Sequence, residues 1–314
     1  MWVSLALLLL GVLTALTAPR LLARAHWAER EPVVALWVWQ CAVATVLVSF
    51  ALSMTFSAAA AWQAVRGQVF APAPRAVLDA YELSTDGGPW SAALAVVLAA
   101  GGLWSGAMLG REIGLARTRR RKRRDDLLVR APQLPGEEPD GGRLVVLEGE
   151  RPDAWWLHGT TPRLVITTAA LRRLKGRRLD ALLAHEQGHA RARHDWLLHC
   201  SGALASGFPG IPVFIAFREE MHRLVELAAD DVASRRFGRL TVALALVELN
   251  EERGVFAAPP GTGPEAGLPQ RVDRLLTATP RLPAAHRLRL TATAALVPAV
   301  PVLIALFPGL AALG

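Results

Sequence analysis

Long uncharged apolar runs are the main feature of the hydropathy pattern of this chain. Four of them contain no Asp, Glu, Lys or Arg: residues 2–19, 33–65, 87–110 and 290–314. About 20 apolar residues are enough for a helix to cross a bilayer, so the pattern predicts four transmembrane helices. We interpret the first run as a retained helix rather than a cleaved signal peptide, because it lacks a charged segment before it and further spans follow.

Basic residues determine the predicted orientation of these helices. The block Arg117-Thr-Arg-Arg-Arg-Lys-Arg-Arg124 follows the third run, in a chain whose formal net charge is +8. Because Lys and Arg gather on the cytoplasmic side of membrane proteins, residues 117 to about 289 are predicted to be cytoplasmic, with both termini outside. The block would lie against anionic lipid headgroups, so the lipid bilayer is an expected partner. Nucleic-acid binding is disfavoured, since no interleaved aromatic residues or binding fold accompany the block.

Short elements of mixed polarity separate the third apolar run from the fourth. Residues 125–142 are rich in turn-forming and acidic residues and are interpreted as a linker. Three short strands are predicted, at residues 144–147, 154–157 and 163–167. Helices are predicted at residues 171–174, 179–199, 221–236 and 240–249, and from residue 269. The uncharged segment 196–217 is interrupted by Gly207-Phe-Pro-Gly210, so we predict two short helices in a hairpin, buried or dipping into the membrane surface.

The strongest chemical signal is the pattern H-E-x-x-H at residues 185–189. Positions i and i+4 of a helix lie on one face, so His185 and His189 can direct two imidazoles at one cation. This is the pattern of a zinc hydrolase, in which Glu186 would accept a proton from the attacking water. The alternative is a solvated helix with two spare histidines. The mostly apolar residues 179–184 argue against it, because a buried Glu186 is costly unless a cation accompanies it.

Four segments carry a resemblance to a known family. They are His185-Glu-Gln-Gly-His189, Arg193-His194-Asp195, Glu226-Leu-Ala-Ala-Asp230-Asp231 and Arg271-Val-Asp-Arg-Leu-Leu276. With them, the chain resembles the BlaR/MecR-type membrane zinc metallopeptidases and is more distantly similar to the HtpX and CAAX-prenyl proteases.

The resemblance implies a catalytic Zn²⁺ and a role for each matching residue. The zinc ligands that it implies are His185, His189 and Glu226. Glu186 would be the general base, and Asp230 would orient a ligand histidine. Arg271 matches an arginine that the family repeats, so we expect it either to stabilise the oxyanion or to be a charge on the surface of a helix.

His194 competes with Glu226 as the third zinc ligand, because it lies close to the motif. One class of zinc proteases places its third histidine six residues beyond the second, after a glycine turn. Here Ala192 takes the place of that glycine, and His194 is only five residues beyond His189. A continuous helix would rotate His194 by about 140° off the ligand face. Glu226 brings Asp230 one turn later on its own face, so we predict Glu226 as the ligand and expect His194 to be dispensable.

Together these features predict a mainly α-helical, four-span integral membrane protein with a cytoplasmic α+β, zincin-like peptidase domain, built from the motif helix and a small β-sheet. The predicted parts are a three-span membrane region (1–116), a basic juxtamembrane segment and linker (117–142), a zinc peptidase domain (143–286) and a fourth transmembrane helix (287–314).

The expected activity is that of a zinc metalloendopeptidase of the cell membrane that cleaves a cytoplasmic protein. The resemblance implies a signalling role, with a transcriptional repressor of the winged-helix type as the substrate. Two alternatives stay open. One is a quality-control protease for membrane proteins, and the other is a non-enzymatic, zinc-bound membrane regulator that binds a partner protein.

Overall fold

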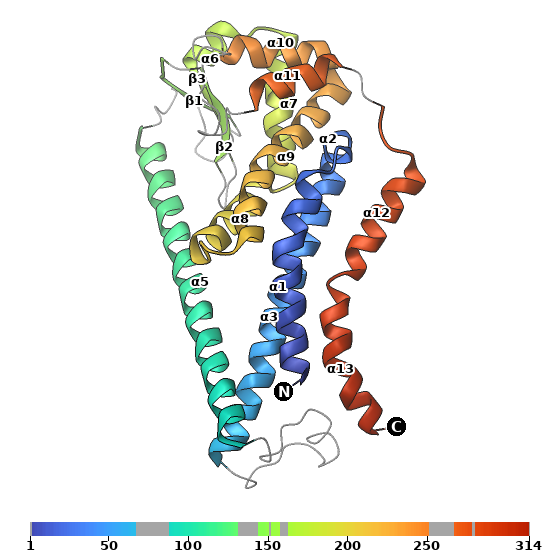
Figure 1. Cartoon of the computed structure of the whole chain (residues 1–314). Coiled ribbons are helices and arrows are strands. Elements are labelled where there is room, and N and C mark those ends of the chain that lie inside the picture. The colour runs from blue at the N-terminus through green and yellow to red at the C-terminus, as the bar shows by residue number, and fades with distance from the viewer. Residues whose placement is uncertain are drawn as a thin grey trace.

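The computed structural model describes residues 2–66, 88–130, 144–150, 152–157, 163–250, 267–277 and 280–313. Long helices form one end of the molecule, and a unit of shorter helices and strands lies at the other (Figure 1). Both termini lie at the end far from the strands. The topology predicted from the basic residues also places both termini on one side.

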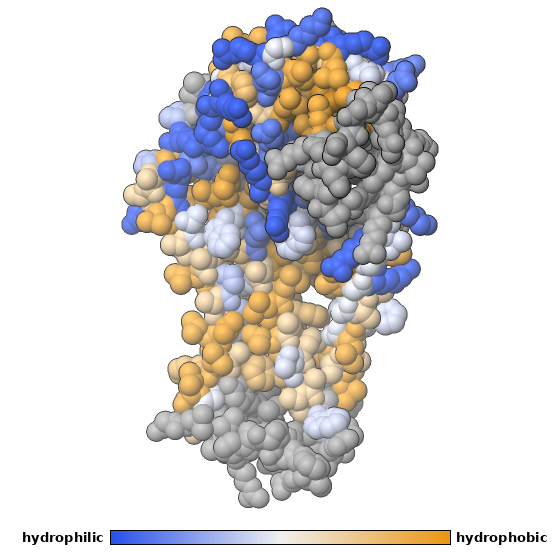
Figure 2. All heavy atoms as spheres, turned by 180° about the vertical axis from the view of Figure 1, so that it is seen from behind, coloured by the Kyte–Doolittle hydropathy of each residue, from blue (hydrophilic) through white to orange (hydrophobic). Residues whose placement is uncertain are grey.

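Two mainly apolar helices, α1 (Trp2–Ala23) and α3 (Pro32–Arg66), form an antiparallel pair joined by the short helix α2 (Trp27–Arg30). The hydroxyl of Ser53 donates a hydrogen bond of 2.9 Å to the carbonyl of Ser4, so this buried polar group is satisfied within the pair. Hydrophobic side chains cover much of the outer surface at this end of the molecule (Figure 2). Such a surface suits a lipid environment better than water.

Among the described residues, two helices have the length and hydropathy of a membrane span, at residues 2–23 and 32–60. Helices α12 (Ala284–Leu296) and α13 (Ala299–Leu313) make a third if they act together, with a bend of 42° between them. Pro298 lies at this bend, as expected for a residue that cannot continue the hydrogen bonds of a helix.

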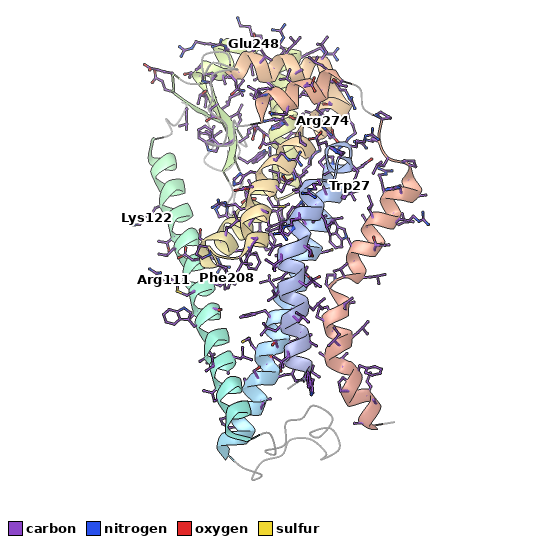
Figure 3. All side chains as sticks on the ribbon, viewed as in Figure 1. Trp27, Arg111, Lys122, Phe208, Glu248 and Arg274 are labelled. Atoms are coloured by element: carbon purple, nitrogen blue, oxygen red, sulfur yellow. The ribbon has the colours of Figure 1, made fainter. Side chains whose placement is uncertain are left out.

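Helix α5 (Gly88–Arg130) begins with the third predicted span and continues without a break through the basic block at residues 117–124. The span within it stays a prediction. Lys122 is exposed on the outer side of α5 (Figure 3). The segment 125–142, predicted as a linker, is therefore helical at its start, whereas residues 131–143 lie outside the described part of the chain.

The three predicted strands form one sheet at the predicted residues: β1 (Leu144–Leu147), β2 (Ala154–Leu157) and β3 (Arg163–Thr167). Strand β3 lies in the centre, parallel to β1 and antiparallel to β2. The sheet shares a core with α6 (Thr168–Arg173) and α7 (Arg177–Arg191), in which Ile166 and Leu182 are buried. Edge strand β2 packs against α7, which carries the H-E-x-x-H motif.

The motif helix is shorter than predicted. Helix α7 ends at Arg191, so the helix predicted over residues 179–199 is wrong at its C-terminal end. Arg193 has a φ of 52°, in the left-handed region, and a new helix, α8 (His194–Gly207), begins directly after it. Left-handed backbone is unfavourable for a residue with a side chain, and Ala192 before it is a strong helix former. The residue types therefore give no warning of this break.

Helix α8 and helix α9 (Pro212–Phe237) form a hairpin at the predicted place, but the second helix is not short as predicted, because it has 26 residues. The helix that carries Glu226 begins at residue 212 rather than 221, because Pro fits the first turn of a helix and the apolar residues after it continue the helical pattern. The first half of α9 packs on α1 and α3, where the rings of Phe217 and Trp39 lie 6.4 Å apart in one apolar core. The hairpin thus anchors the motif region to the long apolar helices.

The last helices of the unit that contains the strands are α10 (Arg239–Asn250) and α11 (Leu268–Leu276), both close to their predicted positions. Helix α11 is hydrogen-bonded to the turn between the first two long helices. Nε of Arg274 donates a hydrogen bond of 2.7 Å to the carbonyl of Glu29, at the turn where Figure 3 labels Trp27. The unit that contains the strands is therefore fixed to the long apolar helices at a second place.

Candidate metal centre and active site

Helices α7 and α9 pack against each other so that two histidines of one helix face a glutamate of the other. Nε2 of His185 lies 3.1 Å from Nε2 of His189 and 3.5 Å from Oε2 of Glu226. Nε2 of His189 lies 3.4 Å from Oε1 of the same glutamate. The residues predicted as ligands thus bring their ligand atoms to one point, all within 4.8 Å of one another.

The spacing of these atoms fits a tetrahedral divalent cation. Ligand bonds of about 2.0–2.1 Å at tetrahedral angles place pairs of ligand atoms about 3.4 Å apart. The separations of 3.1, 3.4 and 3.5 Å are each close to this value, with Oε2 of Glu226 facing His185 and Oε1 facing His189. Two imidazole nitrogens and one carboxylate oxygen leave a fourth position open, which is typical of a catalytic rather than a structural site.

Gly188 allows the close approach of the two helices. A Cβ at this position would lie 3.3 Å from Cβ of Val232 and 3.4 Å from Cα of Ala229, both on α9. Glycine within a helix costs about 1 kcal/mol relative to alanine. The contact with α9 explains why the sequence nevertheless has a glycine between the two histidines.

Asp230 lies behind the first histidine of the motif. Its Oδ1 is 3.0 Å from Nδ1 of His185, and the residue is fully buried, with 0% exposure. The N–H bond of the ring does not point in line with this oxygen, so the contact is an ion-pair contact rather than an aligned hydrogen bond. A carboxylate at this position keeps a proton on Nδ1 and directs the lone pair of Nε2 toward the ligand cluster.

Arg271, on α11, connects Asp230 with Glu226. Its Nε and Nη2 donate hydrogen bonds of 2.8 and 2.7 Å to the carboxylate of Asp230. Its Nη1 lies 2.8 Å from Oε2 of Glu226, and only 11% of the arginine side chain is exposed. The alternative that Arg271 is a surface charge is therefore wrong, and three of its nitrogens contact carboxylates of the centre.

The charges around the ligand atoms favour a cation. Burial lowers the pKa of His185, but Asp230 and Glu226 outweigh it and raise this pKa to about 10. Burial raises the pKa of Glu226, but Arg271 and His185 hold it well below its usual range. Burial lowers the pKa of His189 to about 3, and positive His185 adds to the effect, so His189 is neutral. Surroundings that favour positive charge at His185 also favour a divalent cation there.

Glu186 lies beside this cluster on α7. Burial raises its pKa to about 7, with positive His185 opposing the rise and the carboxylates of Glu226 and Asp153 adding to it. A carboxyl group with a pKa near neutrality can both accept and return a proton at pH 7. Asp153 directly precedes β2, so the edge strand lies on the side of the centre that holds this carboxyl group.

His194 lies at the centre too, although the sequence predicts that it turns away. After the left-handed Arg193, its side chain returns toward α7, and its Nδ1 lies 3.0 Å from Nδ1 of His189. The residue is buried, with 4% exposure, and the two rings meet edge to face. It is not one of the three clustered ligand residues. Sequence reasoning missed it because no Gly or Pro between the two histidines indicates a break.

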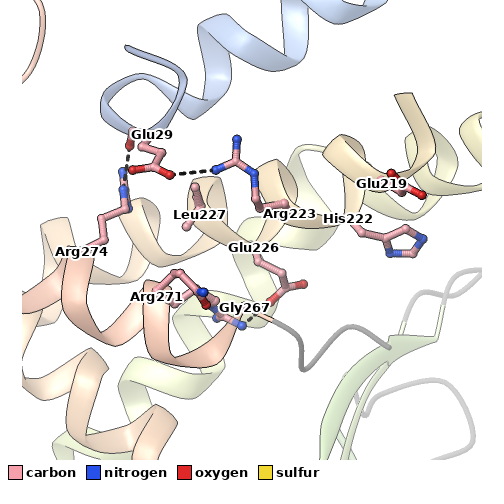
Figure 4. Close-up of a pocket in the computed structure, with 10 residues that line it drawn as sticks. Glu29, Glu219, His222, Arg223, Glu226, Leu227, Gly267, Arg271 and Arg274 are labelled. Carbon is pink, nitrogen blue, oxygen red and sulfur yellow. Dashed lines mark hydrogen bonds and ion pairs between the residues drawn. The ribbon is translucent and has the colours of Figure 1, made fainter. Parts of the chain in front are cut away.

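A cavity of about 300 Å³ opens next to the centre. Glu226 and Arg271 line it together with residues of α9 and α11, among them the exposed His222 (Figure 4). Arg223 closes one side through an ion pair of 3.3 Å with Glu29, on α2. The cavity leaves room for part of a substrate beside the glutamate of the cluster.

Comparison with known protein families agrees with this geometry. The family described as Peptidase family M48 matches residues 116–279, slightly more than half of the chain. The matched segment contains α7, α9 and α11, and with them every side chain of the centre. No curated protein and no solved structure matches the chain.

Proposed function

The chain belongs to peptidase family M48, and from this premise we propose that it is a zinc-dependent endopeptidase. The observation that carries the proposal is the convergence of His185, His189 and Glu226, with ligand atoms 3.1 to 3.5 Å apart. Two histidines and one glutamate are an established ligand set for catalytic zinc. When bound, zinc polarises a peptide carbonyl and makes water more acidic.

Glu186 supplies the proton transfers of the proposed reaction. Its carboxylate accepts a proton from water while the oxygen of that water bonds to the carbonyl carbon of the peptide. The carboxylic acid then gives the proton to the amide nitrogen as the C–N bond breaks, which yields an amine and a new carboxyl group. A pKa of about 7 suits both transfers, because neither form of Glu186 is strongly favoured at neutral pH.

Asp230 and Arg271 have positioning roles in this proposal. Asp230 fixes the ring of His185 from behind, at 3.0 Å. Arg271 holds the carboxylates of Asp230 and Glu226 at 2.7 to 2.8 Å, so both enter the centre in fixed orientations. Stabilisation of an oxyanion by Arg271 stays a prediction. An oxyanion would compete with the two carboxylates for the N–H groups of this guanidinium.

The free edge of β2 supports a binding mode for an extended peptide. Within the described sheet β2 pairs with β3 alone, and it packs against the motif helix. A peptide can add to such an edge through main-chain hydrogen bonds. Because β2 packs against the helix that carries Glu186, a peptide bound at this edge would run past the proposed base.

The first candidate substrate is a cytoplasmic protein, with a transcriptional repressor in a signalling pathway as the specific case. Its support is the resemblance to the BlaR/MecR-type peptidases, together with the basic block at residues 117–124, which favours the cytoplasmic side for the centre. The apolar helices α1 and α3 support a location in the cell membrane. No direct contact with nucleic acid is part of this proposal.

The second candidate substrate is a membrane protein, and one feature of α9 favours it. This helix packs on α1 and α3 through Phe217 and carries Glu226 nine residues later. At 1.5 Å per residue the two positions are about 14 Å apart. If α1 and α3 cross the bilayer, the centre lies near the membrane surface, within reach of a segment that leaves the membrane.

A comparison of wild type with Glu186→Gln tests the proposed activity. The amide cannot accept a proton, so we expect the variant to keep zinc and to lose proteolysis. Proteomics of the membrane and cytosolic fractions should then show one intact protein that accumulates.

The identity of the accumulating protein separates the candidate substrates. A cytosolic repressor would support signalling, and a membrane protein would support quality control. A variant that keeps zinc and cleaves at the wild-type rate would exclude Glu186 as the base. If the wild-type protein carries zinc but no protein accumulates in cells with Glu186→Gln, the non-enzymatic regulator would be favoured.

A further inference from the structure

The two histidines of the motif have different partners behind them. Nδ1 of His185 faces the carboxylate of Asp230 at 3.0 Å. Nδ1 of His189 faces another imidazole, that of His194, also at 3.0 Å. The proposed zinc site gives the first of these partners a role, whereas His194 is neither one of the ligands nor the base.

The position of His189 decides which of its nitrogens carries the proton when a cation is bound. Its Nε2 faces Nε2 of His185 and the carboxylate of Glu226, at 3.1 and 3.4 Å, so this nitrogen must offer its lone pair. The proton of the neutral ring then sits on Nδ1. The atom placed to accept it is Nδ1 of His194, which in turn must carry its own proton on Nε2.

We propose that His194 is a positioning residue that accepts a hydrogen bond from Nδ1–H of His189 and thereby fixes the ring and the tautomer in which His189 holds the metal. The inference rests on the proposed zinc site and extends it. It replaces the expectation from the sequence that His194 is dispensable, because that expectation required a continuous helix through residue 194.

The backbone before His194 supports this role. Arg193 has a φ of 52°, and left-handed backbone is unfavourable for a residue with a side chain. Such strain persists where the surroundings impose it, and it is concentrated at functional sites. Here the left-handed residue ends α7 and turns the next side chain back onto His189.

Substitutions at residue 194 can separate the acceptor atom from the volume of the ring. In His194→Asn, Oδ1 takes the place of Nδ1, since both atoms are bonded to Cγ. His194→Leu fills a similar space without an acceptor. The experiment uses the purified full-length chain in detergent, with zinc titrated against a chelator of known affinity.

Partners behind a ligand histidine typically contribute 10- to 100-fold to metal affinity, so His194→Leu should bind zinc about 10- to 100-fold more weakly and His194→Asn within about threefold of wild type. His286→Leu is the matched control for zinc affinity. It removes an exposed histidine on α12, a helix that contributes no residue to the centre, and should leave that affinity unchanged.

Cobalt(II) provides a readout that does not depend on proteolysis, because its visible absorption reports the ligand geometry. The spectrum should change in His194→Leu and return to that of wild type in His194→Asn. Unfolding temperatures of the metal-free forms show whether each variant folds. If His194→Leu does not fold, His194→Gln takes its place, because its carbonyl lies one bond farther out and misses Nδ1 of His189.

Equal zinc affinity in wild type and His194→Leu would overturn the proposed role. It would also be overturned if His194→Asn bound zinc as weakly as His194→Leu, since packing rather than hydrogen bonding would then explain the loss. A wild-type chain that binds neither zinc nor cobalt would overturn the proposed zinc site itself. The two failures are therefore distinguishable.

Discussion

The guanidinium group of Arg271 holds the buried carboxylate of Asp230 through two hydrogen bonds, of 2.8 Å from Nε and 2.7 Å from Nη2. The same carboxylate lies 3.0 Å from Nδ1 of His185. The remaining terminal nitrogen of the arginine lies 2.8 Å from Glu226. One side chain from α11 is therefore linked to two of the three proposed zinc ligands, one directly and one through Asp230.

Arg271→Met should destabilise the fold and weaken zinc binding together. Removal of one partner from a buried ion pair leaves uncompensated charge and typically costs about 3–5 kcal/mol. Arg271→Lys keeps the charge but cannot form the two parallel hydrogen bonds, so its effect should be smaller. Denaturant unfolding of the metal-free chain and chelator competition measure the two effects.

Arg274→Met is the matched control for this prediction. It breaks the neighbouring ion pair of 2.8 Å with Asp231 on the same helix. It should lower stability while zinc affinity stays near that of wild type. If Arg271→Lys instead lowered only kcat, with stability and zinc affinity intact, the oxyanion role predicted from the sequence would be favoured over the positioning role.

Glu226→Ala should lose most of the bound zinc and all proteolytic activity, because it removes the only carboxylate among the three clustered ligand residues. Glu219→Ala is the control for zinc content, since Glu219 is exposed on α9 about two turns earlier and should keep the wild-type amount of zinc. Elemental analysis of the purified proteins measures the zinc content. Equal zinc in wild type and Glu226→Ala would exclude Glu226 as a ligand.

Local sequence patterns predict the elements of the centre well. The three strands occur at the predicted residues, and the hydroxyl of Thr167 caps the next helix by accepting the N–H of Ala170 at 3.2 Å. The helical spacing places His185 and His189 on one face, where their Nε2 atoms lie 3.1 Å apart. These features depend on neighbours in sequence, and periodicity and capping describe such neighbours.

Contacts between distant segments could not be predicted from the sequence. Arg271 pairs with a carboxylate 41 residues earlier, and its sequence neighbourhood is that of an ordinary amphipathic helix. His194 was assigned the wrong direction because the left-handed turn at Arg193 depends on packing rather than on a turn-forming residue. In both cases tertiary structure decides the role of a residue, and local preferences give no signal of it.

Zinc affinity should increase with pH. Burial lowers the pKa of His185, but Asp230 and Glu226 raise it to about 10, so the metal must displace a proton from this ring. Below that pH the apparent affinity should rise about tenfold per pH unit, with about one proton released for each zinc bound. Chelator competition over a series of buffers measures the slope, and calorimetry in buffers of different ionisation enthalpy counts the protons.

The metal-free chain should show the opposite dependence in its stability. The folded-state pKa of His185 lies above its ordinary value of 6.5, so protonation stabilises the fold fully below about pH 6.5, and this contribution is lost as the pH rises to about 10. Asp230→Asn should reduce both effects, because it removes one of the two carboxylates that raise this pKa. Zinc affinity that does not change with pH would contradict the prediction.

A topology reporter inserted after Asp126 should behave as cytoplasmic, and one inserted near Asp86 as external. The basis is the block of basic residues at 117–124, which the positive-inside rule places in the cytoplasm. Asp86 lies outside the described residues, whereas Asp126 lies in the last part of α5. The reverse pattern would place the peptidase part outside and exclude a cytoplasmic repressor as the substrate.

Alanine at two glycine positions should have opposite effects, because only one of them faces a neighbouring helix. Within a helix, alanine is more favourable than glycine by about 1 kcal/mol. Gly202→Ala on α8 should therefore raise the free energy of unfolding by up to that amount, since a Cβ there has no described atom within 4 Å. In Gly188→Ala the new Cβ lies 3.3 Å from Cβ of Val232 and 3.4 Å from the backbone of Ala229, so α9 must shift by a few tenths of an ångström. That movement separates Glu226 from the two histidines, and zinc affinity should fall.

Thermal unfolding and chelator competition compare the two glycine variants. Equal stabilisation with unchanged zinc affinity in both would show that the contact between α7 and α9 does not set the ligand spacing.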